Sequence, residues 1–246
     1  MRSLPVCALV ALFLPAWPET FAQMPGARPP DVQPKFTQPK LAKLRRDLLV
    51  RYKMDQDARN ALLEEMRSKS AVELTKSKDM PSALMARVEE VDRRNVAWLK
   101  KIVRKVGWPG KTMVGQDGSN AAWLLVQHAD KDPQFQKRCL ALMQPMLDSG
   151  EISKVDFAYL TDRVLVADKR PQRYGTQIDM NKSAMKPFPM EDPPNVDKRR
   201  KSVGLMPMAK YMELVKDMYI GKKDTPTPKP GVITNRALPP GPGRKP

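Results

Sequence analysis

Residues 121–130 read Ala-Ala-Trp-Leu-Leu-Val-Gln-His-Ala-Asp, and this stretch decides the fold class. Its first six residues are apolar on nearly every side of a helix, which predicts a buried central helix over about 119–129. Gln127, His128 and Asp130 place polar groups at the end of this helix. A helix buried on all sides needs others around it, so we expect amphipathic helices on both sides of it in the sequence.

Apolar residues at helical spacing predict two long helices before this stretch. The first covers about 41–66 and the second about 84–106, where Gly107 ends it. Residues 108–118 are rich in Gly and Pro, and we expect a loop there.

The chain after residue 130 continues the helical pattern with one interruption. Asp132-Pro133 is a helix start with proline at the first position, and Ser153 begins the next helix. Residues 171–190 lose the helical period and predict an irregular hairpin. Two short helices are expected to follow, over about 194–203 and 207–219.

These elements predict one mainly α domain of six or seven helices over residues 40–221. About 180 residues can bury enough surface for a single core. Residues 23–39 contain five prolines and predict an extended linker. Residues 222–246 contain seven prolines and six basic residues, which predicts a disordered tail.

The first 22 residues have the pattern of a signal peptide. Arg2 precedes an apolar run over 4–14, and Thr20 and Ala22 are small residues at the spacing of a cleavage site. The run is too short to span a membrane. We therefore expect cleavage after Ala22, a periplasmic or secreted protein, and no stable membrane insertion.

Composition excludes several kinds of site. The chain has one His, and cleavage would leave Cys139 as its only thiol, which excludes His-rich and Cys-rich zinc centres. Cys139 has apolar neighbours at helical spacing and is expected in the core. The sequence predicts no cofactor and no metal, with Asp117, Asp130 and His128 as a minor alternative metal set.

The chain is strongly basic, with a formal net charge of +17. This charge attracts polyanions. An exported protein would meet anionic envelope polymers before nucleic acid, so we expect no nucleic-acid partner. The basic tail could bind such polymers weakly.

One histidine and one acidic residue interrupt otherwise apolar helix positions. His128 follows Leu124 and Leu125 at helical spacing, and Asp130 lies beside it. Asp162 occupies an apolar stripe in the helix that begins at Ser153, with Arg163 next to it. A buried charge without a partner is very costly, so Asp162 must find one.

Further hydrogen-bonding groups are expected to surround His128. Gln127 precedes it, and the predicted hairpin contributes side chains that suit amide or sugar ligands. The candidate ligand-binding residues are Gln127, Arg163, Gln172, Tyr174, Thr176 and Gln177.

The same strings carry a resemblance to a known family. Three polar strings follow one another in the order that the family has: Gln-His-Ala-Asp at 127–130, Tyr-Leu-Thr-Asp-Arg at 159–163 and Pro-Gln-Arg-Tyr-Gly-Thr-Gln at 171–177. Over about 90–211 the chain resembles the bacterial domain-of-unknown-function family 6624. The resemblance implies no activity, cofactor or partner, and it supports treating these strings as one unit.

Three interpretations of the polar groups stay open. The favoured one is a binding or interaction module in the cell envelope, with an unknown protein, peptide or glycan ligand. The alternative is a hydrolase that uses His128 as general base, oriented by Asp130 or Asp162. The third is a purely structural hydrogen-bond network.

Overall fold

The computed structural model describes residues 37–68, 82–179 and 185–220. The predicted signal peptide 1–22, the tail 222–246 and the linker up to residue 36 lie outside the described residues. Within those ranges the protein is mainly α, as predicted, with a short two-stranded antiparallel sheet. No helix in the described ranges is both long enough and apolar enough to cross a membrane.

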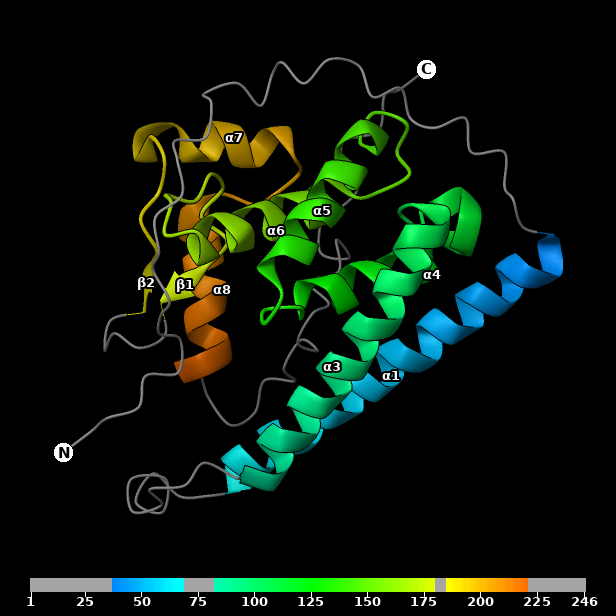
Figure 1. Cartoon of the computed structure of the whole chain (residues 1–246). Helices are drawn as coiled ribbons and strands as arrows, with labels where there is room; N and C mark the ends of the chain where they lie inside the picture. The colour runs from blue at the N-terminus through cyan, green and yellow to red at the C-terminus, as the bar shows by residue number, and fades with distance from the viewer. Residues whose placement is uncertain (1–36, 69–81, 180–184, 221–246) are drawn as a thin grey trace, which may run out of the picture. The chain divides into compact units, whose positions relative to one another are not determined.

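The described part of the chain contains seven α-helices (Figure 1). One 3-10 turn follows α5, and another precedes α7. The helices are α1 (Gln38–Ser68), α3 (Ser82–Val106), α4 (Lys111–Gln127), α5 (Pro133–Met143), α6 (Lys154–Ala167), α7 (Val196–Ser202) and α8 (Met208–Ile220). The two predicted long helices and the two short final ones are all present.

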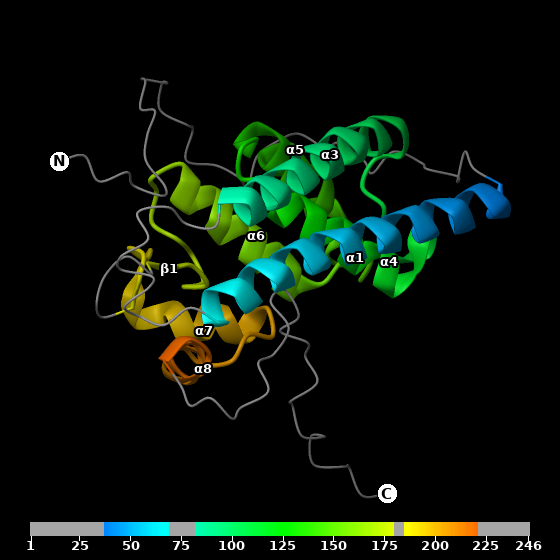
Figure 2. The same ribbon diagram turned by 90° about the horizontal axis from the view of Figure 1, so that it is seen from below.

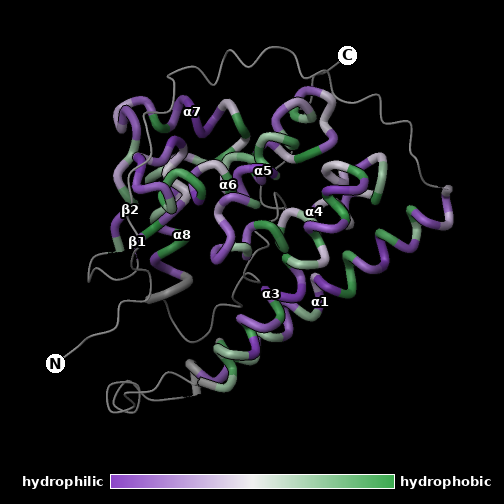
Figure 3. The backbone as a smooth tube through the Cα atoms, viewed as in Figure 1, coloured by the Kyte–Doolittle hydropathy of each residue, from purple (hydrophilic) through white to green (hydrophobic). Residues whose placement is uncertain are grey.

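The long helices α1 and α3 run antiparallel, side by side (Figure 1; Figure 2 shows the same pair from below). The apolar stripe of α1 places Leu44 and Leu48 in the core. Seven residues after Leu48, the stripe continues with Asp55, which is 0% exposed. Charged residues cover the outer faces, so the colours alternate along both helices in Figure 3.

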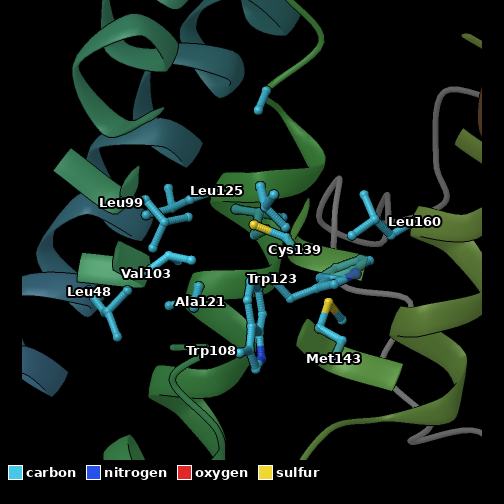
Figure 4. Close-up of a cluster of buried hydrophobic side chains, with 14 of the residues drawn as sticks. Leu48, Leu99, Val103, Trp108, Ala121, Trp123, Leu125, Cys139, Met143 and Leu160 are labelled. Carbon is cyan, nitrogen blue, oxygen red and sulfur yellow. The ribbon is translucent and has the colours of Figure 1, made fainter. Parts of the chain in front are cut away.

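The central helix is α4, which packs against α1, α3, α5 and α6. All six residues of 121–126 are buried, which confirms the prediction of a central buried helix. Figure 4 shows Trp123 and Leu125 among side chains from four other helices, including Leu99 of α3 and Met143 of α5. Burial of one such large apolar side chain contributes about 1.5–3 kcal/mol.

The expected loop over 108–118 was wrong for most of its length, because α4 already begins at Lys111. The carboxylate of Glu151 accepts hydrogen bonds from the backbone nitrogen and the hydroxyl of Thr112, so it caps this helix end. Gly115 has φ 75° and ψ 167° and kinks the helix without ending it. The glycines of this segment therefore suggested a loop, although a distant carboxylate caps the helix and Gly115 only kinks it.

The predicted hairpin is present as two short paired strands, β1 (Ile178–Asp179) and β2 (Lys186–Pro187). A further bridge joins Gln172 to Met190. Ser153 caps α6 by accepting a hydrogen bond from the backbone of Asp156, as its position before the apolar run predicted.

Candidate functional site

The imidazole of His128 is held by a carboxylate that lies 73 residues earlier in the chain. Its Nδ1 lies 2.9 Å from Oδ1 of Asp55, which α1 presents from its buried face. A carboxylate only accepts, so Nδ1 is the donor, and in the neutral ring the lone pair is then on Nε2. His128 follows the last residue of α4, which brings the ring to the surface of α1.

Asp55 is fully engaged on both oxygens. Besides His128, Oδ1 accepts from Arg59 at 2.9 Å, and Oδ2 accepts from the side-chain amide of Gln56 at 2.8 Å. Burial works to raise the pKa of Asp55, but the bonds from His128 and the charge of Arg59 outweigh it and hold the pKa below its usual value. Asp55 is therefore ionised at neutral pH.

Arg59 connects α1 to α3. Its guanidinium also makes two hydrogen bonds, of 2.9 and 3.0 Å, to the carboxylate of Asp92. Burial raises the pKa of Asp92, and Arg59 opposes the rise only in part. Asp55, Arg59, Asp92 and His128 form one network, which we call the His128 cluster.

The second nitrogen of His128 is left open. Within the described ranges no group hydrogen-bonds to Nε2, and the side chain keeps 13% of its surface exposed. In the described part of the chain, the His128 cluster therefore ends in a nitrogen without a protein partner, on a side chain that is partly exposed.

Two buried polar atoms adjoin this cluster in sequence. Asn95, one turn after Asp92 on α3, accepts a hydrogen bond from Arg51 through Oδ1, while its Nδ2 is buried without a partner. Because arginine only donates, this bond fixes which atom of the Asn95 amide is the nitrogen. Oε1 of Gln127, beside His128, is likewise buried and unpaired.

Asp130, predicted to orient His128, bonds instead to Arg163. The guanidinium donates two hydrogen bonds of 2.7 and 2.5 Å to its carboxylate. Asp130 is more than half exposed; partial loss of hydration acts to raise its pKa, but the Arg163 bonds prevail and lower it. The structure therefore brings Arg163 and Asp130 together beside His128, and the carboxylate that holds the ring is Asp55.

Asp162, the other predicted partner of His128, holds the start of the hairpin. Its fully buried carboxylate accepts hydrogen bonds from the backbone nitrogens of Arg173, Tyr174 and Thr176, at 2.7–3.1 Å, and from the Thr176 hydroxyl. Burial raises the pKa of Asp162, and these bonds work against the rise. The sequence was right that this carboxylate needs partners, but it finds them in the backbone.

A buried arginine holds the same loop from its other side. The guanidinium of Arg200, on α7, donates to the backbone oxygens of Tyr174 and Met206, and it lies 4.8 Å from the centre of the Tyr211 ring. The loop's N–H groups thus bind a carboxylate of α6, and its Tyr174 carbonyl binds a guanidinium of α7.

The other predicted ligand-binding residues of this loop have internal partners. The buried amide of Gln172 donates to the backbone oxygens of Gln177 and Phe188 and accepts from the Gln177 nitrogen. The Gln177 amide donates to the Thr176 hydroxyl at 3.1 Å. These groups stabilise the hairpin, and the structure does not join them to His128.

The alternative metal set of the sequence is not assembled. Asp117, in the first half of α4, is paired with Arg45 through hydrogen bonds of 2.9 and 2.7 Å, far along the helix from His128. A different set has ligand atoms close enough for one ion, namely Asp55, Asp92 and His128. Cys139 is fully buried, as predicted, and burial raises the pKa of its thiol to about 12.

Sequence reasoning missed Asp55, Arg59 and Asp92. The criterion that identified Asp162, an acidic residue on an apolar stripe, would also have found Asp55, seven residues after Leu48 and three before Ala58. Asp92 meets the same criterion, four residues after Val88 and seven before Leu99, but its partner is set by the packing of α1 on α3.

The fold and the site together define a class of protein. It is an all-α domain with an aspartate–histidine pair between its two long helices and its central helix. The profile described as "Family of unknown function (DUF6624)" matches residues 43–224, and the chain belongs to this family. Comparisons with curated proteins and with solved structures gave no match.

Proposed function

We propose that this protein is a hydrolase in which His128 acts as general base on a water molecule, oriented by Asp55. The observation that carries the proposal is the 2.9 Å bond from Nδ1 of His128 to a buried carboxylate, while no group among the described residues bonds to Nε2 of this partly exposed side chain. A base positioned in this way can take a proton from water near neutral pH.

This arrangement supports catalysis over the binding role that the sequence favoured. A binding module needs donors and acceptors at its surface, but it does not need a buried carboxylate on the far nitrogen of an imidazole. Asp55 fixes the tautomer of the ring and stabilises the imidazolium that proton transfer produces. Water is the proposed nucleophile, because no serine or cysteine at a recognisable spacing accompanies His128.

A chemical probe tests the base without a known substrate. His128 is the only histidine of the chain, so diethyl pyrocarbonate should modify one imidazole. We expect reaction in the native protein, at a rate that Asp55→Asn changes more than Asp130→Asn does. A native His128 that resists the reagent, or that responds equally to both variants, would contradict the proposal.

Turnover is tested with p-nitrophenyl esters, aminoacyl p-nitroanilides and p-nitrophenyl glycosides. Activity on one of these classes should disappear in His128→Asn and fall about 10²–10⁴-fold in Asp55→Asn. Ligand-induced stabilisation without turnover on any class would favour the binding role instead.

We also propose that the protein works in the cell envelope. The support is the signal-peptide pattern of residues 1–22 and the basic tail 222–246. Exported protein should begin at Gln23 by N-terminal sequencing. Binding to anionic envelope polymers should weaken with salt and with deletion of 222–246, and binding indifferent to both would contradict a role for the tail.

A further inference from the structure

The His128 cluster brings three metal-binding groups together from three parts of the fold. Asp55 comes from α1, Asp92 from α3 and His128 from the end of α4, and one ligand atom of each lies within 4.8 Å of the others. Carboxylate oxygens and an imidazole nitrogen suit divalent transition metals such as Mn²⁺ and Zn²⁺. We infer that Asp55, Asp92 and His128 bind one divalent transition-metal cation, which takes the place of the Arg59 guanidinium.

The charges of the cluster favour this exchange. Asp55 and Asp92 carry two negative charges and Arg59 carries one positive charge, so the cluster has a net charge of −1 with neutral His128. The neighbouring Asp130 and Arg163 neutralise each other. A divalent cation in place of the guanidinium brings the cluster to zero, which lowers the cost of burying its carboxylates.

Arg59 is able to leave. Its side chain is 19% exposed, and its ion pairs in the described part of the chain are those to Asp55 and Asp92. A long arginine side chain near the surface can extend into water with little loss of packing. The two carboxylates, by contrast, are fixed on α1 and α3.

Two unsatisfied polar atoms adjoin the proposed ligands along the helices, since Asn95 lies one turn after Asp92 and Gln127 directly precedes His128. Nδ2 of Asn95, on a side chain that is 2% exposed, lacks an acceptor, and Oε1 of Gln127 lacks a donor. A cation with three protein ligands keeps positions for water. Each such water both donates and accepts, so it is of the right type for an unpaired amide nitrogen or oxygen within its reach.

The cation would not assist the proposed base but would compete with it. The nitrogen that faces the carboxylates is Nδ1, and a metal bound there breaks its hydrogen bond to Asp55. The proton of the neutral ring then moves to Nε2, which loses its lone pair. This inference goes beyond the proposed hydrolysis, which needs no cation at this site.

The experiment is a titration of the EDTA-treated full chain with Mn²⁺, followed by electron paramagnetic resonance. We expect one saturable site in the wild type. Asp92→Asn should weaken it about tenfold or more, as loss of a metal ligand does. Arg59→Met should strengthen it about tenfold by removing the competing charge. The matched control Arg45→Met breaks an ion pair far along α4 from His128 and should leave the affinity unchanged.

Absence of saturable binding in both wild type and Arg59→Met would overturn the inference, as would equal affinity in wild type and Asp92→Asn. Circular dichroism checks the fold of each variant. Should Arg59→Met unfold without metal, Mn²⁺ is expected to refold it, and failure to do so also counts against the site. The diethyl pyrocarbonate test uses metal-free protein, so the two proposals can fail separately.

Discussion

Replacing Asp162 with Asn changes one oxygen of a buried carboxylate into a donor and leaves its size almost unaltered. The carboxylate accepts from three backbone nitrogens and one hydroxyl of the loop over residues 173–176. In the variant, we expect the amide oxygen to keep the place of Oδ1, which accepts from the backbone nitrogens of Arg173 and Tyr174. The amide nitrogen then faces the backbone N–H of Thr176, and two donors cannot form a hydrogen bond. The Thr176 hydroxyl can rotate to accept.

The magnitude follows from these bonds. One buried N–H without a partner costs about 1–3 kcal/mol, and the two remaining N–H bonds lose the strengthening of a charged acceptor, which costs about 1–3 kcal/mol more. Removing a buried charge, whose burial raises the pKa of Asp162, returns part of this. We expect a net loss of about 2–4 kcal/mol in the free energy of unfolding.

Urea unfolding followed by tryptophan fluorescence measures the loss, since Trp108 and Trp123 are both buried. The matched control is Asp130→Asn, the same change at a side chain that is 57% exposed, which should cost about 1 kcal/mol or less. If Asp162→Asn unfolds within about 1 kcal/mol of the wild type, the carboxylate is not what holds the loop.

Three further changes follow from the described contacts. Asp55→Asn should flatten the acid dependence of stability: the lowered pKa of Asp55 means that its ionised form stabilises the fold above about pH 4, and this contribution is lost as pH falls, which acid titration of the unfolding free energy checks. Gly115→Ala should lower stability by about 1–3 kcal/mol in urea, because φ 75° with ψ 167° is strained for any other residue and the added carbon would lie 3.0 Å from Asp117. In a Cys7→Ser background, Cys139 should not react with Ellman's reagent until the protein unfolds, since the thiol is buried and burial raises its pKa to about 12; rapid labelling of native protein would contradict this.

Much of the fold could be predicted because its signals are local. The stripe of α1, the apolar run 121–126 and the cap at Ser153 each depend on residues within one helix. The start of α4 failed for a different reason. Its cap is Glu151, which lies 39 residues from Thr112, so no local pattern could indicate that a helix begins there.

The candidate site was predictable only as single residues. His128 and Asp162 stood out because each interrupts an apolar pattern, but their partners depend on tertiary packing. Asp55 lies 73 residues from His128, and it reaches the ring because α1 packs against α4. Neither predicted partner of His128 bonds to it, since Asp130 pairs with Arg163 and Asp162 binds the backbone of the loop.

The loop between Asp162 and Arg200 has a consequence for the order in which the protein opens. The amide protons of Arg173, Tyr174 and Thr176 bind α6, while Arg200 of α7 binds the carbonyl of Tyr174. Departure of α7 alone would leave those three amides bonded and slow to exchange with solvent deuterium, whereas departure of α6 would release them together. Their exchange rates therefore report which helix leaves the native structure first.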